Sequence, residues 1–132
     1  MSKWNPSEHA LGHADMDATH EEFLDLVTQA QQATNEAFPA AFKALMAHTQ
    51  AHFANEERLM EESGFPAFGE HREDHRRVLG DMTQLASRVE AGRIAFARAY
   101  LRDRILEWFT QHLGTMDSAL AFHLKLAEKR SA

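Results

Sequence analysis

The pair of residues most able to do chemistry is His52 and Glu56, which stand four positions apart in a long stretch without a helix breaker. On a helix this spacing places both side chains on one face, a single turn apart. An imidazole nitrogen and a carboxylate oxygen so placed can bind one metal ion. Pairs with this spacing are also common on helix surfaces, so the pair indicates a metal site only if other ligands join it.

More candidate ligands follow along the chain. His71 and His75 repeat the four-residue spacing, and His112 lies five residues before Asp117. Taken alone, His71 and His75 are more typical of a solvent-exposed surface, because charged residues flank them. We expect a solvated position for the charged residues near the histidines, namely Glu57, Glu61, Glu62, Arg72, Glu73, Asp74 and Arg76.

Four helices are expected to position these residues in an all-α fold, because apolar residues recur with helical spacing and no segment alternates over the length of a strand. Pro39 suits the first turn of a helix, and Gly64 suits a helix end. Asp15 or Asp17 can cap the first helix. We expect an N-terminal arm over 1–15, helices over about 15–35, 39–63, 68–91 and 94–127, and a frayed polar tail over 128–132.

Short loops between these helices predict an antiparallel, up-down-up-down four-helix bundle, which we expect to form one domain over residues 1–132. This topology brings the candidate ligands to the same end of the bundle. They fall early in the first and third helices and late in the second and fourth. The set is His20, His52, Glu56, His71, His75, His112 and Asp117.

This set of five imidazoles and two carboxylates is too large for one metal ion but suits two ions, with the carboxylates bridging. Two dications repel each other, so anions are needed between them. The spacing of His112 and Asp117 is awkward, because residues five apart differ by about 140° around a regular α-helix. We therefore predict a local π-type widening near 113–116, a feature that often marks functional sites.

The composition narrows the chemistry. The chain has no cysteine, which excludes disulfides, thiolate zinc sites and cysteine catalysis, so a metal site must use histidines and carboxylates. A net charge of −6 argues against nonspecific nucleic-acid binding and against binding to anionic membranes. No apolar run reaches transmembrane length, and the first residues lack the apolar core of a signal peptide, so we expect a cytoplasmic protein.

The spacings of these residues resemble those of the hemerythrin family, and of the bacterial hemerythrins in particular, along nearly the whole chain. The matching motifs are Asp17-x-x-His20, His52-Phe53-x-x-Glu56-Glu57-x-x-Met60, Gly64-Phe65-Pro66, His71-x-x-x-His75 and Trp108-x-x-x-His112-x-x-x-x-Asp117. The resemblance implies a non-haem centre of two iron ions, oxo- or hydroxo-bridged, that binds O2 or another small diatomic ligand. The implied ligands are His71, His75 and His112 for one iron, His20 and His52 for the iron that binds O2, and Glu56 and Asp117 as bridges.

A histidine-rich ligand set favours reversible O2 binding over oxygen activation, because carboxylate-rich sets stabilise high oxidation states. We therefore expect an O2-binding protein for storage, delivery or sensing rather than an enzyme. Two alternatives remain open: a di-iron enzyme that acts on peroxide or nitric oxide, and an iron or zinc protein without gas chemistry. The sequence favours no particular oligomeric state.

Four further histidines stand outside the implied ligand set. His48 lies one turn from His52 on the same stripe, at a position where the family usually has an aromatic residue. It is a candidate to line an O2 pocket or to hydrogen-bond a ligand. His13 stands where the family pattern has an apolar residue. His9, His13 and His123 are expected toward the open end of the site.

Overall fold

The structure, a computed structural model, describes the backbone of residues 4–131 and the side chains of residues 4–128. Within this range every regular element is a helix, as predicted, and no strand occurs. The elements are α1 (Pro6–His9), α2 (Ala14–Gln32), α3 (Phe38–Ser63), α4 (Phe68–Glu90), α5 (Ala95–Asp103), α6 (Ile105–His112), the π-helix η1 (Leu113–Asp117) and α7 (Ser118–Ser131). None of the helices between residues 4 and 131 has the length and apolarity needed to cross a membrane.

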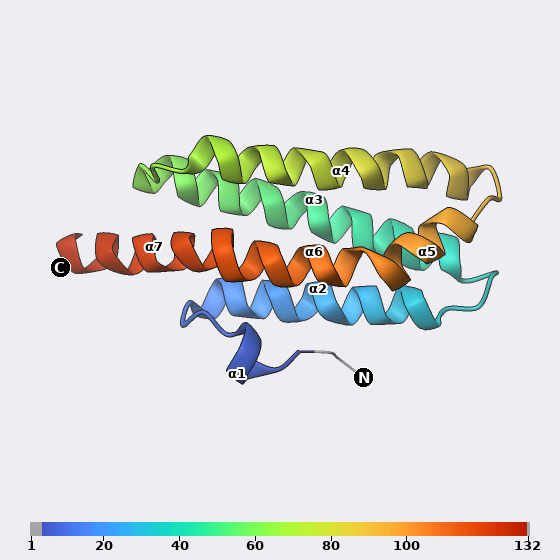
Figure 1. The fold of residues 1–132 in the computed structure, drawn as a ribbon, viewed down its shortest axis with the longest axis horizontal. Coiled ribbons are helices and arrows are strands. Elements are labelled where there is room, and N and C mark those ends of the chain that lie inside the picture. Colours follow the sequence, from blue (N-terminus) through green and yellow to red (C-terminus); the bar gives the residue numbers. More distant parts are fainter. Residues whose placement is uncertain (1–3, 132) are drawn as a thin grey trace.

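The helices form an antiparallel bundle (Figure 1). α2 packs against α3, α3 packs against α4, and α5 contacts both α4 and α2, which closes the arrangement. The fourth helical segment of the bundle is made of α5, α6, η1 and α7, which follow one another in one direction. The short α1 lies outside the bundle, beside the first half of α2. The predicted up-down-up-down topology is therefore confirmed.

Two apolar clusters fill the interior of the bundle. The larger cluster is rich in phenylalanine and includes Phe23, Phe38, Phe42, Phe53 and Phe109. The smaller cluster consists of Met16, Met60, Phe65, Leu120, Ala121 and Leu124. Rings from both clusters contact histidines of the predicted ligand set. The candidate site therefore lies between the two clusters and is covered by apolar residues on both sides.

The first bundle helix begins earlier than predicted. α2 starts at Ala14, and its N-cap is His13, whose Nδ1 accepts a hydrogen bond from the Met16 N–H at 3.2 Å. Asp17, one of the two predicted caps, instead accepts a hydrogen bond from the Leu11 N–H at 2.8 Å and so ties the arm to the helix. The predicted aspartate cap was wrong because an imidazole nitrogen can also accept from the free N–H groups of a first helical turn.

The loop after α3 agrees with its sequence signals. α3 ends at Ser63, and Gly64 follows with φ +67°, a left-handed conformation that glycine adopts without strain. The Phe65 N–H then donates to the Met60 carbonyl at 2.9 Å. This tight end reverses the chain, so the last turns of α3 and the first turns of α4 lie at the same level.

Both ends of the chain are more regular than predicted. The arm contains α1, which is capped by the Asn5 side chain accepting from the Ser7 N–H at 3.1 Å. At the other end, α7 continues to Ser131, so the expected frayed tail is helical as far as that residue. Residues 1–3 of the predicted arm and residue 132 of the predicted tail lie outside the described residues.

The predicted fourth helix is interrupted. α5 ends at Asp103 and α6 begins at Ile105, with Arg104 between them at φ −123° and ψ −42°. Near this break the Nε2 of Gln31, from α2, donates a hydrogen bond to the Leu101 carbonyl at 2.7 Å. In a regular helix this carbonyl accepts from the N–H four residues later. A side chain inserted from a neighbouring helix is a known cause of such breaks, and helical periodicity alone does not reveal it.

Candidate metal centre

The structure brings all seven predicted ligands together in the interior. Each of them is buried, with at most 7% of its surface exposed. They are His20 on α2, His52 and Glu56 on α3, His71 and His75 on α4, His112 on α6 and Asp117 on η1. Burial of so many polar side chains in one place is costly unless they bind one another or a ligand. The cluster is therefore the candidate functional site.

Glu56 lies at the centre of the cluster and faces histidines on two sides. Its Oε2 is 2.7 Å from the Nε2 of His52 and 3.3 Å from the Nε2 of His20. Its Oε1 is 3.2 Å from the Nε2 of His75 and 3.3 Å from the Nε2 of His71. Each oxygen of this carboxylate thus faces a different pair of histidines.

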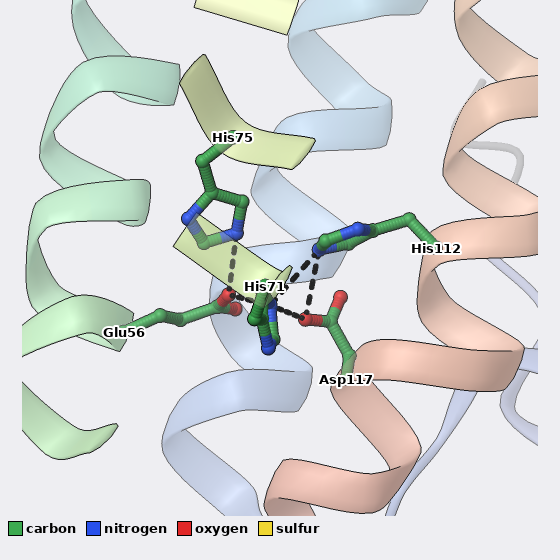
Figure 2. A group of neighbouring side chains, drawn as sticks. All are labelled: Glu56, His71, His75, His112 and Asp117. Carbon is green, nitrogen blue, oxygen red and sulfur yellow. Dashed lines mark hydrogen bonds and ion pairs between the residues drawn. The ribbon is translucent and has the colours of Figure 1, made fainter. Parts of the chain in front are cut away.

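Asp117 divides its oxygens in the same way. Its Oδ2 is 3.2 Å from the Nε2 of His20, and its Oδ1 is 3.1 Å from the Nε2 of His71 and 3.2 Å from that of His112. Figure 2 shows five of the side chains converging from three sides, namely Glu56, His71, His75, His112 and Asp117. Among the described residues, the groups able to hold a metal ion are Glu56, His71, His75, His112 and Asp117, and His20, His52 and Glu56.

The predicted widening of the last helix is present. η1 covers Leu113–Asp117, which confirms a π-helix in the predicted region. In a π-helix the backbone hydrogen bond spans five residues instead of four, so residues five apart share a face. His112 and Asp117 consequently both point into the cluster, as a regular α-helix would not allow.

Several buried atoms of the cluster lie close to charged neighbours but make no well-directed hydrogen bond among the described residues. They include the Oε1 of Glu56, the Nε2 of His75 and the Oδ1 of Asp117, all in the larger of the two groups. Buried polar atoms normally have a partner, and a metal ion bound among these atoms would supply one. Imidazoles and carboxylates without thiolates fit iron, manganese, copper or zinc. The residues present therefore fit a metal centre.

The carboxylates also control the protonation of the metal-free cluster. Burial lowers the pKa of His20, but its hydrogen bonds to Asp117 and Glu56 outweigh burial and raise that pKa to about 9. The same balance raises the pKa of His71 to about 9. Burial raises the pKa of Glu56, but hydrogen bonds from the surrounding histidines overcome it and hold the pKa well below its usual range. A metal ion must displace the histidine protons in order to bind.

Two carboxylates that were predicted to be solvated contact candidate ligands instead. Asp74 is 8% exposed, and its Oδ2 lies 2.7 Å from the Nδ1 of His112. The Oε2 of Glu57, which is half-buried, lies 3.2 Å from the Nδ1 of His75. The sequence offered one sign that Asp74 is buried. Asp74 stands four residues before the core residue Val78, so the two side chains share one face of the helix. The other charged residues of that prediction are exposed or half-buried, namely Glu61, Glu62, Arg72, Glu73 and Arg76.

His48 does not join the cluster as a hydrogen-bonding partner. Its Nε2 lies 3.2 Å from the Oε2 of the exposed Glu22, and its Nδ1 has no hydrogen-bond partner among the described residues. Among the described residues, His48 therefore makes no hydrogen bond to a candidate metal ligand, and its place in an O2 pocket stays a prediction. The ring does contact the cluster, because it packs edge-on against the ring of His52 with centroids 6.0 Å apart.

The remaining extra histidines also lie outside both ligand groups. His13 caps α2, and the Nε2 of His123 donates to the Ser63 carbonyl at 2.9 Å, so both lie at the end of the bundle predicted for them. The ring of His9 packs edge-on against the ring of Phe109 with centroids 5.9 Å apart. These contacts give the three residues structural roles.

Comparison with known families decides where this chain belongs. The sequence model of the hemerythrin HHE cation binding domain matches residues 11–121. The chain belongs to the hemerythrin family. The resemblance inferred from the ligand spacings is therefore confirmed.

Individual relatives agree with the family. Bacteriohemerythrin from Ralstonia nicotianae is 36% identical over 115 residues, which cover 87% of this chain and 82% of that protein. Myohemerythrin from Riftia pachyptila is 28% identical over 102 residues, which cover 77% of this chain and 82% of that protein. A crystal structure of wild-type hemerythrin has a TM-score of 0.81 and 21% identity, with 94% of this chain and 98% of that chain covered. This last similarity shows that the two chains share the hemerythrin fold.

Proposed function

We propose that this hemerythrin-family protein holds a non-haem di-iron centre and binds O2 reversibly, for storage, delivery or sensing. The observation that carries the proposal is the division of the carboxylate oxygens. Glu56 and Asp117 each direct one oxygen to each of two histidine groups. This arrangement suits two metal ions that share two anionic bridges. The description of the family as a cation binding domain and the similarity to bacteriohemerythrin support the same choice.

The two metal positions differ in their number of histidines. The three-histidine position consists of His71, His75 and His112, and the two-histidine position consists of His20 and His52. Glu56 and Asp117 would bridge the two positions and reduce the repulsion between the cations. With fewer protein ligands, the two-histidine position keeps room for a small ligand. When bound, the iron pair supplies that open position and the electrons that O2 binding requires.

Two phenylalanine rings pack against the two-histidine position. The ring of Phe109 packs edge-on against that of His20 with centroids 5.8 Å apart, and Phe23 lies 6.4 Å from His52 in the same way. Both phenylalanines are at most 3% exposed. Such walls exclude water, and with it protons, from the space beside the ligands. A dry site favours the release of O2 unchanged over its reduction, which supports the binding function.

Oxygen uptake tests this proposal. The anaerobically reduced protein is expected to take up O2 in proportion to its iron content and to release it under argon over repeated cycles. An oxygen electrode and the visible absorption spectrum measure both steps. Protein stripped of iron by a chelator is the control and is expected to take up none. Uptake without release would contradict reversible binding.

The position of His48 favours a second candidate function, a di-iron enzyme that acts on peroxide or nitric oxide. His48 packs against the ring of His52, and its Nε2 faces the exposed Glu22, so a titratable ring stands between solvent and the two-histidine position. Unchanged O2 binding and slow autoxidation in His48→Ala would support the binding protein. Peroxide turnover that is lost in this variant would support the enzyme. A metal protein without gas chemistry would be colourless or would lack a charge-transfer band that forms reversibly with air.

The net charge of −6 supports the absence of nucleic-acid and anionic membrane partners. The cytoplasmic location and the single domain over residues 1–132 stay predictions.

A further inference from the structure

The outer nitrogens of the candidate ligand histidines are supported unequally. The Nδ1 of His112 donates to the Oδ2 of Asp74 at 2.7 Å, and the Nδ1 of His75 donates to the Oε2 of Glu57 at 3.2 Å. A carboxylate only accepts hydrogen bonds, so each carboxylate fixes the tautomer with the proton on Nδ1. The Nε2 lone pair of each ring is then free for a metal ion, and for His75 that nitrogen lies 3.2 Å from the Oε1 of Glu56.

Asp74 is itself held in place by two further donors. Its Oδ2 also accepts from the Nε1–H of Trp108 at 3.0 Å, and its Oδ1 accepts from the Arg77 guanidinium. The ring of Trp108 stacks on the ring of His112 with centroids 4.7 Å apart. The His112 ring is therefore fixed both along its edge and on its face.

The two-histidine position lacks such support. The Nδ1 atoms of His20 and His52 are buried and have no hydrogen-bond partner among the described residues. In the three-histidine position, only His71 has a buried Nδ1 without a hydrogen-bond partner among those residues. Carboxylates thus back two of the three histidines of one position and neither histidine of the other.

We propose that Asp74 and Glu57 are positioning residues that make the three-histidine position the tighter of the two metal positions, so that it fills first. This inference rests on the proposed two-metal site. A carboxylate behind a ligand histidine fixes the ring and strengthens it as a donor, and loss of such a partner typically lowers metal affinity about 10- to 100-fold. The two added negative charges further favour a dication there. Metal then enters the two-histidine position last and leaves it first under chelation.

Calorimetric titration of the metal-free protein with Zn²⁺ tests the inference. Zn²⁺ has the charge of Fe²⁺ and no redox chemistry, so binding is measured without oxygen chemistry. The native chain is expected to bind two ions in two resolved steps. Asp74→Asn keeps the shape of the side chain and removes its charge. It is expected to weaken the tighter step about 10- to 100-fold and to leave the weaker step unchanged. Glu57→Gln is expected to do the same.

Two ligand variants assign the steps, and a third variant serves as a control. His52→Ala should remove the weaker step, and in that background Asp74→Asn should still weaken the remaining one. His112→Ala removes the ring that Asp74 supports, so a second substitution of Asp74 should then have little further effect. Glu22→Gln is the matched control, because Glu22 lies 3.2 Å from the Nε2 of His48, which is not a candidate ligand. This control should change neither step.

Selective weakening of the tighter step supports the inference. Equal weakening of both steps, or no change in either, overturns it, because a merely structural role would not distinguish the two positions. Circular dichroism of each metal-free variant shows whether it folds. If Asp74→Asn does not fold, Glu57→Gln tests the inference instead, because Glu57 is only half-buried. Two ions of equal affinity in the native chain would overturn this inference alone, whereas a native chain that binds neither Zn²⁺ nor Fe²⁺ would refute the proposed function.

Discussion

His112 and Asp117 stand five residues apart, and the Nε2 of His112 nevertheless lies 3.2 Å from the Oδ1 of Asp117. The π-helix over Leu113–Asp117 makes this contact possible, because its wider turn brings residues five apart to one face. The widening therefore adds a second carboxylate to the one that α3 supplies. A local change in backbone geometry completes the proposed pair of bridges.

Removal of the Asp117 charge should lower the metal content. Asp117→Asn leaves one fewer anion between two dications, so the content after anaerobic reconstitution with Fe²⁺ should fall from about two ions per chain to about one or fewer. Metal analysis of the desalted protein measures this. Glu62→Gln, at an exposed residue of α3, is the control and should keep the native content. Native content in Asp117→Asn would exclude a bridging role for this residue.

Replacement by alanine should change the free energy of unfolding in opposite directions at two glycines that have equal room for a side chain but different backbone conformations. A Cβ added at Gly114 or at Gly64 meets nothing within 4 Å, but only Gly64 has a positive φ, of +67°. Gly114→Ala should raise the free energy of unfolding by about 0.5–1 kcal/mol, because alanine has less freedom to lose on folding. Gly64→Ala should lower it by about 1–2 kcal/mol, because a side chain is strained there. Urea unfolding of the metal-free protein measures both, and shifts of the same sign would contradict the assigned conformations.

Phe53 should contribute strongly to the stability of the bundle. It is 1% exposed, and its ring stacks on that of His75 with centroids 3.9 Å apart. Phe53→Ala should lower the free energy of unfolding by about 3–5 kcal/mol, through lost burial and the cavity left behind. Phe122→Ala is the control, because Phe122 is 65% exposed and its removal leaves no cavity. This substitution should change the free energy of unfolding by no more than about 0.5 kcal/mol. Similar losses in the two variants would place Phe53 outside the core.

The metal-free protein should lose stability as the pH rises from 6.5 to 9. Hydrogen bonds to Asp117 and Glu56 raise the pKa values of His20 and His71 from 6.5 to about 9, despite the opposing effect of burial. In this range the folded state binds more protons than the unfolded state, so stability is greatest below pH 6.5 and falls toward pH 9. Melting temperatures across the range measure the effect.

The metal-loaded protein provides the control for this pH dependence. Its ligand histidines carry no proton on the atoms that bind metal, so its melting temperature should not fall over the same range. A metal-free protein whose stability rises between pH 6.5 and 9 would contradict the assigned hydrogen bonds.

Features that depend on local sequence were predictable. Gly64 ends α3 where its conformational freedom indicated, and the five-residue spacing of His112 and Asp117 predicted the π-helix because it conflicts with α-helical geometry. The convergence of the seven candidate ligands also followed from the sequence, since their positions along antiparallel helices place them at one level.

Features that depend on which side chains the fold brings together were not predictable. Gln31 reaches the Leu101 carbonyl across the bundle, 70 residues away in sequence, near the break in the last helix. Asp74 reaches His112 over a separation of 38 residues, and its charged neighbours made it resemble a solvated residue. In both cases a tertiary partner satisfies a group that the sequence shows only in its local context.

One spectroscopic measurement, combined with an iron count, tests the proposed di-iron centre and its binding of O2. The visible spectrum of the anaerobically reduced protein is recorded before air, after air and again under argon. The protein should hold two irons per chain and show a charge-transfer band that appears with air and disappears under argon. Protein purified and reconstituted with Fe²⁺ that holds no iron, or iron-loaded protein whose spectrum does not change with air, would contradict this proposal.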